Sequence, residues 1–328
     1  MKIACDLCAH LCELADGARG RCGVRENRGG AIVTVNYGRV VALAADPIEK
    51  KPLYHFLPGT ATLSVALHGC NFTCSFCQNH EISQKEHFSA TAGYPLPPAE
   101  LARQWEARPT PSVSFTYSEP LVWQDYLLDA AALLRPRGAR IVMVTNGFFS
   151  DAALDRLLPV VDAFNIDVKG DDRFYRERCG GRLDPVLRGI ERIAAAPGKV
   201  LEATTLVIEG AHTADDIVAL GKRLAACGVQ VWHLSAYHPA YRLSLPATSE
   251  RFLLALCDRV RAEVLIPYVY AGNIRSSDGD HTRCAACDLL LITRRGFSVI
   301  DNLIRDNCCP SCHRPVYGLF EDPRSTRK

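Results

Sequence analysis

Apolar runs and helical segments alternate along this chain from residue 62 onward, and this alternation limits the fold more than any other feature. The apolar runs are rich in β-branched residues, whereas the segments between them are rich in Ala and Leu at helical spacing. Parallel strands need crossover helices, so a series of such units predicts a parallel sheet or barrel. The series holds six units, fewer than the eight of a closed barrel, and therefore predicts an open, partial (β/α)6 barrel.

The predicted elements can be placed by residue number. Strands are expected at 62–68, 112–117, 140–145, 163–168, 200–208 and 230–236, with a final strand at 264–270. Helices are expected at 98–107, 121–135, 151–158, 184–196, 213–226 and 248–261. Residues 31–45 are expected to form a hairpin that turns at Tyr37 and Gly38. We therefore expect an α/β chain of three parts: a Cys-rich module and hairpin at 1–60, the barrel at 61–275 and a zinc-ribbon-like module at 276–328.

Charge and hydropathy exclude several classes of function. The net charge is +2 and no basic run occurs, which argues against nucleic acid as a partner. No apolar run reaches the roughly 18 residues that a membrane-spanning helix needs. The first residues, MKIACDLCAH, lack the apolar core of a signal peptide, so we expect a cytoplasmic protein.

Cysteine usage is unusual for such a protein. Of the fifteen cysteines, twelve fall in three tight groups, and in a reducing compartment such groups indicate metal. Cys227 and Cys257 lie in apolar, helix-like surroundings and are expected to be small buried side chains. Cys179, in RCGG, is expected to be another, although it could also approach the site as a ligand or hydrogen-atom donor.

The ends of the predicted strands carry residues that suit a binding site. They read HGC (68–70), TYSEP (116–120), TNG (145–147), DVKG (167–170), VIEG (207–210) and AYHP (236–239). In β/α barrels the chemistry lies at the carboxyl ends of the strands. Polar, Gly or Pro residues at all six ends therefore indicate a site lined from several strands.

The first of these ends leads into a loop with Cys70, Cys74 and Cys77, spaced C-x3-C-x2-C. Three thiolates can hold three irons of a 4Fe–4S cluster and leave the fourth iron open for a ligand. Reactive metal sites leave a position open in the same way. The alternative is a zinc site completed by His68 or His80.

This loop, after the first strand of a six-unit partial barrel, resembles that of the radical S-adenosylmethionine (radical SAM) enzymes. In that superfamily an aromatic residue often precedes the third cysteine, and Phe76 fills that place. The resemblance implies that the open iron binds the amino and carboxylate groups of S-adenosylmethionine. It also implies reductive cleavage of S-adenosylmethionine to a 5′-deoxyadenosyl radical, which abstracts hydrogen from a substrate.

Within that resemblance the other strand ends receive roles as cofactor-binding residues. Glu119 would pair with the methionine ammonium, because a carboxylate binds a cation. Asn146, Asp167 and Lys169 would face the same mouth and suit the ribose hydroxyls and the methionine carboxylate. Tyr237 and His238 would lie near the adenine. The alternative for each residue is an ordinary turn or helix-cap role.

The resemblance extends to one branch of the superfamily. CQNHEISQ resembles a loop of pyruvate formate-lyase activating enzymes. Together with DPIEKKPLYHFLPG (46–59) and DVKGDDRFYRERCGG (167–181), it is similar to the AmmeMemoRadiSam system radical SAM enzymes. That branch implies Memo-like and AMMECR1-like proteins as partners, and radical chemistry implies an electron donor such as flavodoxin or ferredoxin.

Two further groups of four cysteines flank the barrel. Cys5, Cys8, Cys12 and Cys22 are spaced C-x2-C-x3-C-x9-C, and Cys284, Cys287, Cys309 and Cys312 are spaced C-x2-C-x21-C-x2-C. Four-thiolate sites are closed and usually structural, so zinc is expected in the second group, where Cys308 could compete with Cys309. For the first group zinc and an auxiliary 4Fe–4S cluster both remain open.

Three functions are compatible with these residues. The first is a radical SAM enzyme acting on an unidentified substrate, which is either a small molecule or a protein. The second is an activase that makes a glycyl radical in a partner, as pyruvate formate-lyase activating enzymes do. The third is a zinc-dependent scaffold without radical chemistry, against which the intact Cys70, Cys74, Cys77 and Glu119 argue.

Overall fold

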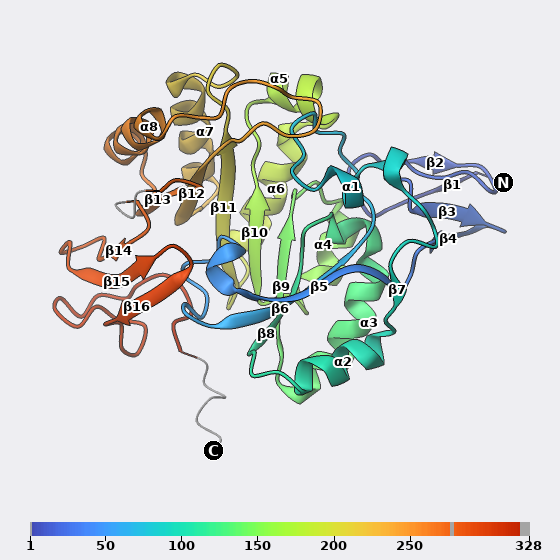
Figure 1. Ribbon diagram of the computed structural model, residues 1–328, viewed down its shortest axis with the longest axis horizontal. Helices are drawn as coiled ribbons and strands as arrows, with labels where there is room; N and C mark the ends of the chain where they lie inside the picture. The colour runs from blue at the N-terminus through green and yellow to red at the C-terminus, as the bar shows by residue number, and fades with distance from the viewer. Residues whose placement is uncertain (1, 276–278, 322–328) are drawn as a thin grey trace.

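A curved sheet of nine strands forms the centre of the protein in the computed structural model, which describes residues 2–275 and 279–321 (Figure 1). The strand order is β13-β12-β11-β10-β9-β8-β6-β5-β7. Strands β6 and β8 to β13 run parallel, whereas β5 and β7 extend the sheet antiparallel at one edge. The bounds are β5 Arg39–Pro47, β6 Ala61–Leu67, β7 Tyr94–Pro95, β8 Ser112–Phe115, β9 Arg140–Thr145, β10 Ala163–Asp167, β11 Val200–Val207, β12 Val231–Ala236 and β13 Tyr268–Gly272.

Helices connect the parallel strands, as such strands require. The connecting helices are α2 Pro98–Glu106, α3 Gln124–Leu134, α4 Asp151–Leu157, α6 Leu183–Ala194, α7 Ala214–Ala226 and α8 Glu250–Glu263. Short helical turns fill the loops: η1 Ile48–Lys50, α1 His80–Ser83, η2 Lys85–His87, η3 Pro120–Trp123, η4 Arg135–Arg137, α5 Asp172–Phe174 and the π-helical turn η5 Tyr175–Cys179. The partial barrel predicted from the sequence is confirmed, because the sheet is open and each predicted strand and helix is present.

Local sequence explains where several of these helices begin. The side chains of Ser150, Thr213 and Ser249 each accept a backbone N–H from the residue three positions further on. Thr213 also takes part in a capping box with Asp216, in which each satisfies the other's backbone N–H. Among the described helices, none has the length and apolar character needed to cross a membrane.

The hairpin predicted for residues 31–45 is wrong. Strand β4 (Ala31–Thr34) pairs with β3 (Arg25–Arg28), whereas β5 pairs with β6 in the main sheet. Gly29 and Gly30 both have positive φ, +60° and +90°, and two such residues suit the tight turn of a hairpin. At the predicted turn only Gly38 has a positive φ, so that turn cannot bring its flanking strands together in the same way.

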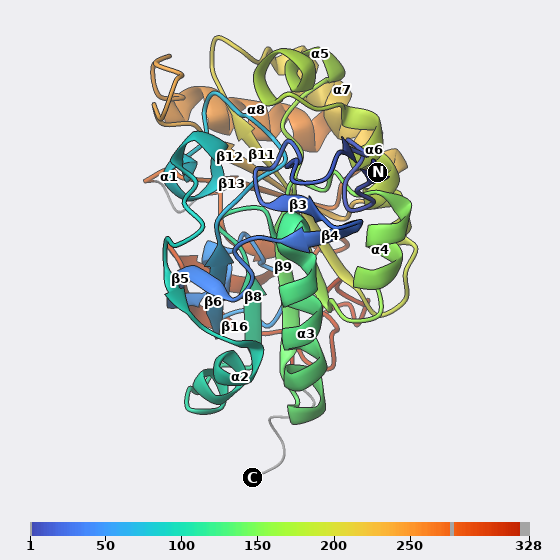
Figure 2. The same cartoon turned by 90° about the vertical axis from the view of Figure 1, so that its right-hand side faces the viewer.

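The two Cys-rich segments lie at opposite ends of the molecule (Figure 1). The N-terminal segment holds β3, β4 and the short pair β1 (Ile3–Ala4) and β2 (Glu13–Leu14), and it lies beside α4 (Figure 2). The C-terminal segment is a three-stranded sheet of β14 (Thr282–Arg283), β15 (Leu290–Arg295) and β16 (Ser298–Asn302). Residues 276–278 and 322–328 of the predicted C-terminal module lie outside the described residues.

A buried polar network ties the C-terminal segment to the sheet. Glu202 of β11 is fully buried and accepts hydrogen bonds from the backbone N–H groups of Tyr54 (3.0 Å) and His55 (2.7 Å), and it is paired with His233 Nε2 (2.6 Å). The segment around His55 in turn pairs with Leu319. Burial raises the pKa of Glu202, but the hydrogen bond from His233 and the nearby charges bring it below the ordinary value.

Replacing this carboxylate should destabilise the whole fold. Glu202→Ala leaves three buried donors without their acceptor, and we expect a loss of about 3–5 kcal/mol, seen as a lower melting temperature. Because the folded pKa is lowered, the wild-type contribution is present above the unfolded pKa and is lost as the pH falls through the folded pKa. The variant should therefore be less sensitive to acid. Glu263→Ala, at the exposed end of α8, is the control and should change stability by about 0.5 kcal/mol or less. A melting temperature of Glu202→Ala equal to that of the control would show that the network is dispensable.

Candidate functional site

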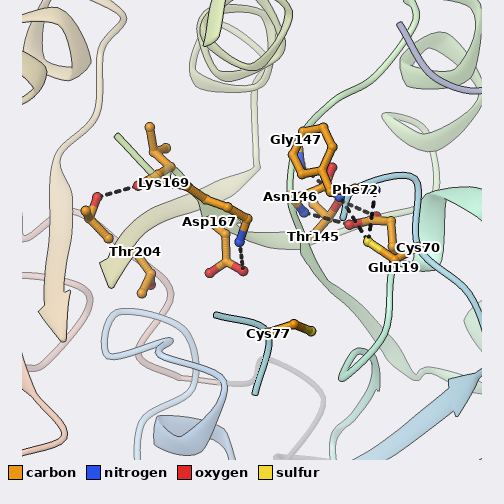
Figure 3. Close-up of polar contacts among 12 residues, drawn as sticks. Cys70, Phe72, Cys77, Glu119, Thr145, Asn146, Gly147, Asp167, Lys169 and Thr204 are labelled. Atoms are coloured by element: carbon orange, nitrogen blue, oxygen red, sulfur yellow. Dashed lines mark hydrogen bonds and ion pairs between the residues drawn. The ribbon is translucent and has the colours of Figure 1, made fainter. Parts of the chain in front are cut away.

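The carboxyl ends of the parallel strands surround one cavity of about 320 Å³. Its lining comes from the ends of β6, β8, β9, β10, β11 and β12 and from the cysteine loop. The predicted site residues that line it are Cys70, Cys74, Phe76, Cys77, Glu119, Asn146, Asp167 and Lys169. Figure 3 shows Cys70 next to Glu119 and Asn146, with Cys77 and the Asp167–Lys169 pair on other sides of the same space.

The cysteine loop begins where β6 ends. Gly69, with φ +124°, allows the sharp turn, and a Cβ there would lie 2.8 Å from Val24. The loop is then fixed from behind by η5, since the backbone N–H of Thr73 donates to Cys179 (2.9 Å) and that of Ser75 to Arg178 (3.1 Å). Its three thiols are thus held at set positions around the cavity.

Two of the three loop thiols, those of Cys70 and Cys77, have polar neighbours suited to a thiolate. The backbone N–H of Phe72 donates to Cys70 Sγ (3.4 Å), and Cys77 Sγ contacts Ser83 Oγ (3.1 Å). Burial nevertheless raises the pKa of Cys70 and of Cys77. The pKa of Cys74 is raised as well, mainly by its contact with the Cys179 thiol and also by burial. These thiols therefore need a metal to hold them as thiolates.

The spacing of the three thiols suits a cluster more than a single ion. Tetrahedral zinc at about 2.3 Å from each sulfur brings the sulfurs within about 3.8 Å of one another. Among the described residues, the loop thiols do not form a set within 4.8 Å, either with one another or with His68 or His80. His68 instead faces the carbonyl of Glu81 (3.2 Å) and His80 stacks on Tyr241. The alternative of a zinc site completed by either histidine has no geometric support.

Glu119 lies at the floor of this cavity and is buried. One carboxylate oxygen accepts from the Thr145 hydroxyl (2.6 Å) and the Leu121 N–H (3.0 Å), and the other from the Asn146 N–H (2.7 Å). Glu119 therefore caps η3 and lines the cavity at once. A carboxylate has about four acceptor positions, so one remains for a ligand. Burial raises the pKa of Glu119 to about 7.

Asn146 connects Glu119 with the cysteine loop. Its Nδ2 donates to Asn71 Oδ1 (2.7 Å) and lies 3.7 Å from Cys70 Sγ. Further along the rim, Lys169 Nζ pairs with Asp167 (3.1 Å). Burial lowers the pKa of Lys169, but the Asp167 carboxylate outweighs it, and the net pKa is well above the ordinary value. This lysine is a fixed cation at the cavity.

Two of the predicted contacts are placed elsewhere. Tyr237 is fully buried, and its hydroxyl donates to the Leu243 carbonyl (2.6 Å). His238 is exposed, with Nε2 3.4 Å from the Asn273 carbonyl. Neither side chain is among the described residues that line the cavity. The ring of Phe76, by contrast, is buried at the cavity and packs on Phe174 at 5.5 Å between ring centroids.

Some residues at the cavity were not predicted as site residues. Lys50 and Lys51 line it from η1, and Tyr117, Asn79 and Asn273 line it from loops. The lysines lie in DPIEKKP, and neither the spacing nor the composition of this stretch indicates a site. Lys51 is buried against Asp46 (2.7 Å), so Lys50, which pairs with the same carboxylate at 2.8 Å, is the more accessible cation. Both lysines follow strand β5, which runs antiparallel before the first barrel unit, and the sequence does not indicate that the residues after this strand reach the cavity.

The C-terminal cysteines form a compact set. The sulfurs of Cys284, Cys287, Cys309 and Cys312 lie within 4.8 Å of one another, with Cys284–Cys312 at 3.6 Å and Cys287–Cys309 at 3.7 Å. These distances match one tetrahedral ion. The backbone N–H of Cys312 lowers the pKa of Cys309 to about 7, which favours the thiolate. Cys308 is outside the set.

Comparisons with known proteins agree with this geometry. The sequence profile of the radical SAM superfamily matches residues 65–224. The uncharacterized protein MJ0808 of Methanocaldococcus jannaschii is 35% identical, and the match covers 96% of this chain and 95% of that protein. A 7-carboxy-7-deazaguanine synthase of Methanothermobacter thermautotrophicus is 30% identical over 46% of this chain and 56% of its own length.

Solved structures show the same fold. Streptococcus suis SuiB, in its crystal structure bound to S-adenosylmethionine, has a TM-score of 0.52 and 14% sequence identity to this chain. The match covers 69% of this chain and 53% of SuiB. At that identity the likeness concerns the fold and not the substrate.

Proposed function

Since this chain belongs to the radical SAM superfamily, we propose that Cys70, Cys74 and Cys77 hold a 4Fe–4S cluster at which S-adenosylmethionine is reductively cleaved. The observation that carries this proposal is the shared cavity: three fixed thiols, a buried carboxylate and the partly buried Lys169 all line it. Its volume of about 320 Å³ is in the range of small-molecule sites. When bound, the cluster would supply the electron needed to split S-adenosylmethionine into methionine and a 5′-deoxyadenosyl radical, and this radical would take hydrogen from the substrate.

The side chains of this chain bind and orient the cofactor. Glu119 has a free acceptor position for the methionine ammonium, and Lys169 offers a cation for its carboxylate. Asn146 lines the cavity beside Cys70, and its amide is hydrogen-bonded to Asn71 Oδ1 and the Phe148 N–H, so we assign it the role of holding the cysteine loop next to Glu119. Phe76 and Phe72 shield the loop from water.

A glycyl-radical activase would use the same centre but a different substrate. Incubating the reduced protein with S-adenosylmethionine and deuterium-labelled candidates separates the two functions. Deuterium that enters 5′-deoxyadenosine from a small molecule supports the first, whereas deuterium from a glycine of a partner protein supports the activase. If no 5′-deoxyadenosine is formed under any condition, the proposed function is wrong.

The role of Glu119 gives a prediction on cofactor affinity. Glu119→Gln removes the charge that would pair with the ammonium, and a charge-assisted hydrogen bond is worth about 1.5–3 kcal/mol. We expect S-adenosylmethionine to bind about ten- to hundredfold more weakly. Because the pKa of Glu119 is raised to about 7, wild-type affinity should rise as the pH rises through 7, and the variant should lack this step.

The helix-capping role of Glu119 needs a matched control. Thr213→Ala removes the cap of α7, outside the cavity, and should cost about 1 kcal/mol of stability while leaving affinity unchanged. Isothermal titration and thermal melting on both variants separate binding from folding. If Glu119→Gln behaves as Thr213→Ala does, Glu119 has only a structural role.

A further inference from the structure

The four N-terminal cysteines lie near one another in the folded chain. Strands β1 and β2 bring Cys5 next to Cys12, whose carbonyl accepts from the Cys5 N–H (2.9 Å). A Cβ placed on Gly20 would lie 3.7 Å from Cys22 Sγ and 3.8 Å from Cys12 Sγ, so these two thiols flank the same glycine. Cys5, Cys8 and Cys22 are buried, and all four are free thiols.

Donors already surround these thiols. The thiols of Cys5, Cys8 and Cys22 each face the backbone N–H two positions further along, at Leu7, His10 and Val24. Cys70 has the same relation to Phe72. Hydrogen bonds of this kind to sulfur are a means by which proteins tune iron–sulfur clusters.

A buried cation also faces the group. The Arg25 side chain is 8% exposed and interacts with the thiols of Cys5 and Cys22. Its Nη1 pairs with Asp125 (2.9 Å), but its Nε is buried with no hydrogen-bond partner among the described residues. A buried donor without an acceptor is costly, and a negatively charged thiolate site would satisfy it.

The spacing of the thiols separates the two candidate metals. In the C-terminal group, which suits one ion, the four sulfurs lie within 4.8 Å of one another; these are the sulfurs of Cys284, Cys287, Cys309 and Cys312. The N-terminal thiols, like those of the cysteine loop, do not form such a set in the described part of the chain. A cubane binds each thiolate at a different iron, so its ligands stand further apart than those of one zinc ion.

From this geometry we infer that Cys5, Cys8, Cys12 and Cys22 hold an iron–sulfur cluster instead of zinc, and that this cluster exchanges electrons with the centre at Cys70. The first half is independent of the function proposed above, whereas the second half rests on it. The first half follows from the spacing of the thiols, and the second from where the N-terminal segment lies.

Asn71 connects the two cysteine groups. It follows Cys70 directly, its Oδ1 lies 3.9 Å from Cys70 Sγ, and its amide interacts with the Cys8 thiol. Asn71 is 2% exposed, and its buried Nδ2 has no partner at ordinary hydrogen-bond distance among the described residues. A cluster sulfur or thiolate at Cys8 would give this donor an acceptor.

Backbone contacts fix the N-terminal segment in this position. His10 Nε2 lies 2.9 Å from the Asn71 carbonyl, and the N–H of Ala9 donates to the Phe148 carbonyl (3.1 Å). Asn71 alone therefore lies between Cys70 of the loop and Cys8 of the N-terminal cysteine group. In the electron step, a low-potential one-electron donor such as reduced ferredoxin or flavodoxin would reduce the N-terminal cluster by one electron. That electron would then pass to the Cys70 centre, which would be reduced by one electron as the first cluster is reoxidised.

Metal analysis of the full-length, anaerobically reconstituted protein tests the first half. We expect about eight irons and one zinc per chain in the wild type. The variant with Cys70, Cys74 and Cys77 changed to Ala should keep about four irons, those at the N-terminal cysteines. Cys12→Ser should disturb the binding of these same irons. Cys227→Ala, outside every group, should match the wild type. Two zinc ions per wild-type chain, with no iron left in the loop variant, would overturn the inference. About four irons in both the wild type and the loop variant would show that the loop holds no iron, and would overturn the proposed function alone.

Electron paramagnetic resonance of the reduced protein tests the second half. Two paramagnetic clusters joined through Asn71 should broaden or split each other's signals in the wild type, and either variant should show a simple, narrow signal. A wild-type spectrum equal to the sum of the two variant spectra would mean that the clusters are not in contact. This readout does not depend on enzyme activity.

Discussion

Changing Cys70, Cys74 and Cys77 together to Ala should reduce the cleavage of S-adenosylmethionine to the level of a protein-free blank. The cavity would keep its shape, but nothing in it would hold the irons, and about four irons per chain should be lost. Cys227→Ala is the control, because it removes a thiol at the end of α7 that lines no cavity described here. Cleavage that survives in the triple variant would show that the reaction centre lies elsewhere.

The second large effect is expected at the C-terminal metal group. Cys309→Ser removes one ligand of a compact four-thiol set, and structural zinc contributes about 10–16 kcal/mol of folding free energy in small domains. We expect loss of zinc, a lower melting temperature and rapid proteolysis within β14 to β16. The buried apolar residues of this segment are few, namely Leu291, Ile292, Ile304, Val316 and Phe320, so we expect a bound metal to supply much of its stability.

The neighbouring cysteine provides the matched control for that experiment. Cys308 is adjacent in sequence but lies outside the compact set, so Cys308→Ser should keep its zinc and its resistance to protease. Equal losses of zinc in both variants would contradict the ligand assignment. An absence of zinc in the wild type would contradict the choice of metal.

The parallel part of the fold could be predicted because its physical signal is local. Strands such as β12 (VWHLSA) are buried along their whole length and are mainly apolar, and each is followed by a helix with a regular apolar face. The antiparallel edge could not be predicted in this way. The pairing of β5 with β6 joins residues 39–47 with residues 61–67, and no local pattern distinguishes it from a hairpin with β4.

The residues of the site likewise divide into those that the sequence could predict and those that it could not. Glu119 and Asn146 could be predicted because they follow strands directly, and strand ends meet at one edge of the sheet. Tyr237 also follows a strand, yet its hydroxyl is used by the loop that ends at Thr248 and not by the cavity. The contact of Cys179 with Cys74 depends on the π-helical turn η5, which sequence spacing does not reveal. The distances between thiols, which separate clusters from single ions, likewise exist only in three dimensions.

Product analysis is the most direct test of the central claim that Cys70, Cys74 and Cys77 form a radical SAM centre. The reconstituted protein is incubated anaerobically with S-adenosylmethionine, with and without a low-potential reductant, and the products are separated by liquid chromatography. The account predicts 5′-deoxyadenosine and methionine in equal amounts, formed only with reductant and only when the three cysteines are present. Intact S-adenosylmethionine, or S-adenosylhomocysteine without 5′-deoxyadenosine, would contradict it.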